Sequence, residues 1–267
     1  TVNGVAIATV LSNVVSSAIL YRRLRKSDQY IHVDPKRFAI HWGSFRQILR
    51  IGLPAGIQSA VFAVSNIVIQ SAINSLGTIV MAASSAALNI EIMAYYIMNS
   101  FSQACATFVG QNYGAGQVKR CRKVLGLCIL EDAIATASAI FIILFAGKAV
   151  LALFNPDPQV IDIGYTRLLI VFTAYTFSML YDVMSGYLRG FGISLVPALL
   201  VIFGVCGVRI LWILFVFPTS RTFATIMYVY PISLGITALL IGIAVLVFRP
   251  SKRLAGQAQN ADSPSAT

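Results

Sequence analysis

Long apolar runs restrict the fold of this chain more than any other feature. A helix needs about 20 mostly apolar residues to cross a bilayer, and the sequence predicts seven such spans. They cover residues 2–21, 52–75, 79–109, 124–147, 163–188, 195–217 and 224–248. Residues 51–90 carry no charge and are too many for one span, so we expect a break at Gly77-Thr78.

The composition agrees with membrane insertion. Hydrophobic residues make up 58% of the chain and charged residues only 11%, whereas soluble proteins average about a quarter charged residues. The predicted fold class is therefore all-α, a polytopic helix bundle embedded in the lipid bilayer. The four cysteines show no metal-ligand spacing, so we expect buried free thiols rather than a disulfide framework.

The net charge of +11 is distributed by topology and does not indicate a nucleic-acid partner. If seven helices alternate, sixteen Lys and Arg residues fall on one side, in residues 22–50, 110–123, 189–194 and 249–267. The opposite loops hold only Lys148 and Arg221. Basic loops stay in the cytoplasm, which predicts a multi-pass protein of the inner (plasma) membrane with its C-terminus cytoplasmic and residue 1 outside.

Three apolar spans carry polar residues at helical spacing, so each set shares one helix face. The sets are Asn66, Gln70 and Asn74; Glu91, Tyr95, Asn99 and Ser102; and Tyr175, Ser178, Asp182, Ser185 and Arg189. Such faces avoid lipid by meeting each other or a wet cavity. We expect the three faces to converge in the bundle of residues 51–248, with two acids and few bases. Carboxylates and tyrosine rings there would suit an organic cation.

Candidate binding residues follow from these faces. They are Glu91, Asp182, Tyr95, Asn99, Asn66, Gln70 and Tyr175. Intramembrane acids are functional by default, so Glu91 and Asp182 are candidates for sodium or proton coupling; no other metal site is predicted. The alternative is a structural ion pair with Arg209 or another buried base. For the amide residues the alternative is hydrogen bonding between helices.

Several short motifs occur in an order and at spacings that resemble one transporter family. They are Ile51-Gly52-Leu53-Pro54-Ala55, Phe101-Ser102-Gln103-Ala104, the run from Phe108 to Gly116, the run from Ser185 to Gly192, and Leu195-Val196-Pro197-Ala198. Together they resemble the C-terminal lobe of multidrug and toxic compound extrusion (MATE) transporters.

The resemblance implies a domain organisation, because family members have twelve helices in two lobes. Residues 1–22 would be the last helix of a missing N-terminal lobe, 23–50 a cytoplasmic linker and 51–248 the C-terminal six-helix lobe. The polar tail 249–267 is predicted to be disordered. Trp42 and Phe45 predict an interfacial helix over 41–50 of the linker. Since the chain opens with Thr1, we expect a fragment whose partner is the missing lobe.

The resemblance also implies function: a secondary antiporter that exports drugs or other small cationic or amphipathic compounds in exchange for sodium ions or protons by alternating access. No cofactor is expected. The sodium-type branch has a glutamate two turns after the Pro54 equivalent, where this chain has Phe62, so that sodium site does not carry over. A lipid-linked oligosaccharide flippase, with more basic cavity residues, and a seven-helix receptor are the alternatives. No nucleophile–base pair or phosphate loop favours an enzyme.

Overall fold

The computed structural model describes residues 2–26, 39 and 41–250, and its elements are helical throughout this part of the chain. The chain divides into two units, residues 1–47 and 48–267. In the first unit α1 (Val2–Lys26) coincides with the first predicted span. Residues 27–38 of the predicted linker and 251–267 of the predicted disordered tail lie outside the described residues.

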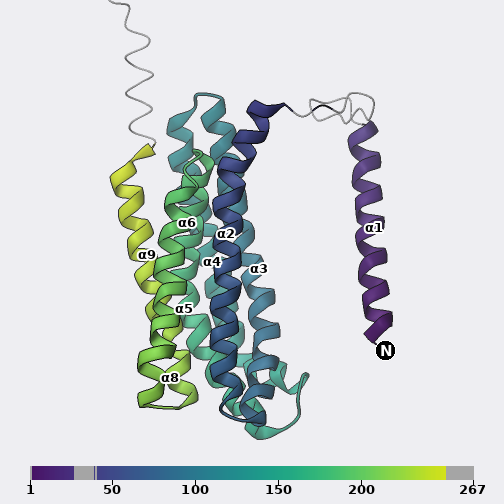
Figure 1. Cartoon of the computed structure of the whole chain (residues 1–267), viewed down its shortest axis with the longest axis vertical. Helices are drawn as coiled ribbons and strands as arrows, with labels where there is room; N and C mark the ends of the chain where they lie inside the picture. Colours follow the sequence, from purple (N-terminus) through teal and green to yellow (C-terminus); the bar gives the residue numbers. More distant parts are fainter. Residues whose placement is uncertain (1, 27–38, 40, 251–267) are drawn as a thin grey trace, which may run out of the picture. The chain divides into compact units, whose positions relative to one another are not determined.

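The second unit is a bundle of helices that run side by side (Figure 1). Six helices of the described chain are long and apolar enough to cross a membrane. They are α2 (Trp42–Asn74), α3 (Thr78–Gly114), α4 (Val118–Ala152), α5 (Pro158–Gly190), the segment Leu195–Thr219 that begins with α6 (Leu195–Val201), and the segment Phe223–Phe248, formed by α8 (Phe223–Met227) and α9 (Val229–Phe248). These six match the last six predicted spans, and the all-α membrane fold is confirmed. The set of six does not include α1.

The first two spans of this unit separate where the sequence predicts. The helix α2 ends at Asn74 and α3 begins at Thr78. Between them Gly77 has a φ of 105°, a left-handed conformation that glycine adopts without a steric penalty. The helix expected over residues 41–50 is present but is not a separate element, because α2 begins at Trp42 and continues through Pro54 to Asn74.

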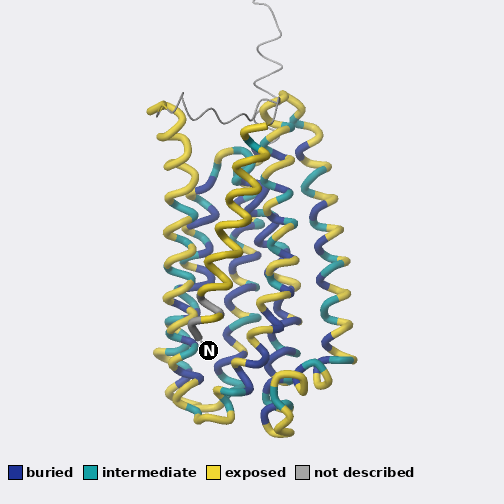
Figure 2. The backbone as a smooth tube through the Cα atoms, turned by 90° about the vertical axis from the view of Figure 1, so that its right-hand side faces the viewer, coloured by how far each residue is buried: buried dark blue, intermediate teal, exposed yellow. Residues whose placement is uncertain are grey.

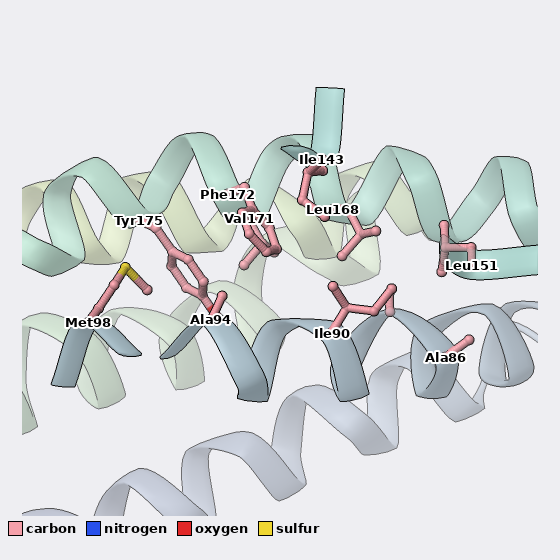
Figure 3. Packing of buried hydrophobic residues seen from close by; sticks show 11 residues of the cluster. Ala86, Ile90, Ala94, Met98, Ile143, Leu151, Leu168, Val171, Phe172 and Tyr175 are labelled. Carbon is pink, nitrogen blue, oxygen red and sulfur yellow. The ribbon is translucent and has the colours of Figure 1, made fainter. Parts of the chain in front are cut away.

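The core of the second unit forms around α5, which packs against α3, α4 and α9. Buried residues alternate with exposed ones along α3, α4, α5 and α9, and Figure 2 shows this alternation in the bundle, as expected for helices with one inward face. One cluster joins α3 to α5, where the ring of Tyr175 lies beside Ala94 and Met98 (Figure 3). Small residues on α3 thus leave room for the larger side chains of α5.

A close approach between two helices of this core depends on Gly186 of α5. A Cβ atom at this position would collide with the backbone carbonyl oxygen of Ser102 on α3. Small residues at helix interfaces allow backbones to approach closely in membranes, where packing rather than the hydrophobic effect drives helix association. The side chain of Ser102 uses this proximity and donates a hydrogen bond to the carbonyl oxygen of Asp182 at 2.6 Å.

Substituting Gly186→Ala tests this approach. The added methyl group must push α3 and α5 apart, so we expect a loss of about 1–3 kcal/mol of stability and a lower Tm in detergent. The matched control is Gly126→Ala on α4, where a Cβ meets no atom within 4 Å. Equal melting temperatures for the two variants would show that the α3–α5 contact tolerates a side chain.

Candidate functional site

A cavity of about 500 Å³ opens among α2, α3, α5, α9 and the segment Leu195–Thr219. Five of the predicted binding residues line it: Asn66, Gln70, Glu91, Tyr95 and Tyr175. Each of the three polar faces therefore contributes two residues to this one cavity, the third face through Tyr175 and Ser178. The remaining lining is dominated by aliphatic and aromatic side chains, the usual character of a small-molecule pocket.

Two predicted binding residues, Asp182 and Asn99, are not among the lining residues of this cavity. Asp182 is nevertheless buried, with 9% of its surface exposed, and points into the bundle rather than to lipid. Its Oδ2 accepts a hydrogen bond from Ser178, which does line the cavity, at 3.4 Å. Asp182 is thus one helical turn from the cavity wall, and Asn99 is half-buried on α3.

Glu91 takes part in a buried ion pair, the alternative considered from the sequence. Its Oε1 accepts from Nε of Arg167 at 2.5 Å and its Oε2 from Nη2 at 2.8 Å. Nη1 of the same arginine donates to Ser84. The two charged residues expose 3% and 2% of their surface. A bidentate pair of this kind neutralises the carboxylate, so Glu91 has little charge left to attract a substrate cation.

Arg209 is a cavity residue that the sequence-based candidate set omitted. It lies in α7 (Val208–Leu211), within the segment Leu195–Thr219, and exposes only 3% of its surface. Its Nε donates to Ser233 and its Nη1 to Asn66, each at 3.3 Å. Among the described residues no carboxylate lies within ion-pair distance of it. Arg209 is the lone base of the apolar run 195–217, and this position could have identified it from the sequence as a candidate functional residue.

Two π-helical segments flank Arg209 along the chain. They are η2 (Ile202–Gly207) before α7 and η3 (Trp212–Val216) after it. π-Helical turns within α-helices are found frequently at functional sites. The wider turns on both sides place Arg209 on the inner face of a span that is otherwise apolar.

The charge balance of the cavity differs from the expectation. We predicted cavity faces with two acids and few bases, but the lining contains one carboxylate, Glu91, and two guanidinium groups, Arg167 and Arg209. The expectation is wrong because periodicity places residues on a helix face without showing which neighbouring helix contributes the rest of the wall. Asp182 lies behind that wall, and Arg209 comes from a segment whose other residues are almost all apolar.

Asp132 on α4 is a third buried acid. The structure buries it fully, and the hydroxyl of Thr136 donates a hydrogen bond to its Oδ1 at 3.4 Å. Its Oδ2 has no hydrogen-bond partner within the described chain. The four cysteines are buried and free, as predicted. The described residues contain no group of three or more His, Cys, Asp or Glu side chains that could hold a metal ion.

Comparison with known proteins places these features in a family context. A family model described as MatE matches residues 54–215, more than half of the chain. A probable multidrug resistance protein NorM of Thermotoga maritima is 28% identical over 262 residues, which are 95% of this chain and 52% of that protein. The multidrug resistance protein PmpM of Pseudomonas aeruginosa is 34% identical over 60% of this chain and 34% of its own length.

Solved structures agree on the fold. An outward-facing multidrug resistance MATE family transporter of the MOP superfamily superposes with a TM-score of 0.81 at 19% identity, over 95% of this chain and 57% of that one. The chain spans about half the length of the curated relatives it matches, or less. The relatives named here are resistance proteins and transporters, not enzymes.

The ion pair between Glu91 and Arg167 predicts a specific pattern of stability. Glu91→Gln leaves a buried guanidinium without its counter-charge, which should cost about 3–5 kcal/mol. Combining it with Arg167→Gln removes both charges, so we expect the double variant to melt at a higher temperature than either single variant. Additive losses in this double-mutant cycle would contradict a coupled pair.

Proposed function

Because this chain belongs to the MatE family, we propose that it forms one lobe of a transporter that exports amphipathic, drug-sized compounds in exchange for sodium ions or protons. The observation that supports this most is the cavity of about 500 Å³ inside a six-span bundle. Its volume and its mostly apolar lining suit a drug-sized molecule. The domain boundaries expected from the sequence, with the lobe at 51–248 and its linker at 23–50, are part of this proposal.

The proposed mechanism is alternating access between inward-open and outward-open states. A second lobe, supplied by the rest of the transporter, would complete the cavity wall. Substrate and coupling ion would shift the equilibrium only by their different affinities for the two states. The cavity residues Asn66, Gln70, Tyr95 and Tyr175 would contact the substrate, and Asn99, which is half-buried on α3, would contribute only indirectly.

Asp182 is our candidate for the coupling acid, whether for a sodium ion or a proton. Support comes from its burial and from the absence of any base within ion-pair distance of its carboxyl in the described chain. A carboxyl in such a place can exchange a cation without first breaking an ion pair. Glu91 is less suited to this role, because Arg167 occupies both of its oxygens.

One observation favours a second candidate function. A lipid-linked oligosaccharide flippase was expected to show basic cavity residues, and two arginines line this cavity. The multidrug relatives support drug export as the first candidate. They do not support a seven-helix receptor.

Substituting Asp182→Asn in the complete transporter tests the coupling role. We expect gradient-driven efflux of a fluorescent drug to fall about tenfold or more, because an intramembrane acid seldom persists without a task. Efflux is measured under separately imposed sodium and proton gradients, and the gradient that loses its effect identifies the ion. The control Glu131→Gln removes an exposed acid from α4. Wild-type rates for Asp182→Asn under both gradients would refute the assignment.

The proposed orientation in the inner membrane, with the C-terminus cytoplasmic, rests on the distribution of basic residues. The native cysteines are buried, so single introduced cysteines can report topology over a low background. In intact cells an impermeant maleimide should label Arg221→Cys and not Lys119→Cys; both positions are exposed. The reverse pattern would invert the topology.

A further inference from the structure

The cavity carries an unbalanced positive charge within the described chain. Glu91 and Arg167 neutralise each other through two hydrogen bonds. Arg209 is the remaining charged lining residue, and the groups that contact it are neutral: the hydroxyl of Ser233, the amide oxygen of Asn66 and two aromatic rings. A buried guanidinium in a membrane span is costly unless a counter-charge or a task compensates it.

Arg209 also keeps hydrogen-bonding capacity that its neighbours do not use. A guanidinium group carries five N–H donors, and the two hydrogen bonds of Arg209 use one donor on Nε and one on Nη1. The planar fork of an arginine matches the two oxygens of a carboxylate, sulfonate or phosphate. The unused donors therefore fit an acidic group better than a neutral one.

Aromatic rings hold this guanidinium in place. Its Cζ lies 4.6 Å from the ring centroid of Tyr230 and 5.3 Å from that of Phe62. Arg167 approaches the same Tyr230 ring at 5.9 Å, so the second guanidinium is close by. Stacking on ring faces positions an arginine without consuming its N–H donors. The rings also offer apolar surface to the rest of an amphipathic molecule.

We propose that Arg209 binds an acidic group of the transported molecule, so that this lobe takes amphipathic anions such as aromatic carboxylates or sulfonates. This inference rests on the proposed function and narrows its substrate class. It replaces the expectation of an organic cation, which depended on a cavity rich in carboxylates. The aliphatic and aromatic lining contacts the apolar part of the molecule, and Arg209 holds the charge.

Two dyes of one ring system test the proposal: the anionic xanthene carboxyfluorescein and the cationic xanthene rhodamine 6G. Their binding to the full purified protein is measured by fluorescence anisotropy. We expect the wild-type protein to bind the anion about fivefold or more tightly than the cation, since one charge-assisted hydrogen bond supports a difference of this size. Tighter binding of the cation, or no binding of the anion, overturns the proposal.

Substitutions locate the effect. Arg209→Gln should weaken anion binding about tenfold or more while changing cation binding little, and Arg209→Lys should restore part of the loss. Arg221→Gln removes an equal charge from an exposed position and should change neither. Equal weakening of both dyes by Arg209→Gln would mean that the residue only maintains the fold, which contradicts the proposal. If this variant does not fold, the wild-type preference between the two dyes decides.

Further measurements separate this inference from the proposed function. Efflux of rhodamine 6G without binding of carboxyfluorescein would retain drug export and overturn the anion site. Specific anion binding without efflux of either dye would retain the site and count against drug export. Displacement of bound carboxyfluorescein by a short-chain phosphatidylglycerol, but not by the matching phosphatidylcholine, would support the site with a lipid as the source of the acidic group.

Discussion

The buried ion pair between Glu91 and Arg167 determines the net charge of the cavity, because it neutralises two of the three charged lining residues. It joins α3 to α5, the central helix of the core, in a region that lipid surrounds. Charges there must be compensated inside the protein, since hydrocarbon offers no partner. With these two paired, Arg209 is the charged lining residue that has no ion-pair partner among the described residues, and the carboxyl of Asp182 lies behind the wall. Both proposals concern these two residues.

In the two proposals, Arg209 binds the substrate and Asp182 binds the coupling ion. Arg209 lines the cavity, where a molecule of drug size fits, whereas Asp182 is buried on α5 and is not a lining residue. Ser178 connects the two regions, since it lines the cavity and hydrogen-bonds Asp182. A change in the charge of Asp182 would therefore reach the cavity wall through one side chain. This hydrogen bond gives a physical basis for the proposed coupling of ion binding to substrate binding.

Close helix packing supports this arrangement. Gly186 lets α5 approach α3, and Ser102 then spans the contact, donating to the carbonyl oxygen of Asp182 while its own Oγ accepts from Arg189 at 3.0 Å. Arg189, in the last turn of α5, thus reaches across to α3. The same contact that holds the bundle together thus also surrounds the candidate coupling acid.

The sequence by itself determined the membrane spans, the break at Gly77 and the residues that face inward. Span length and helical period are local properties, and the polar residues of each span leave one orientation that avoids lipid. The tertiary structure alone decided which charges meet. Glu91 and Arg167 are far apart in the chain, and Arg209 reaches Asn66 and Tyr230 from a span with no polar face. Periodicity within one helix contains no information on its neighbours, so the charge of the cavity could not be predicted from it.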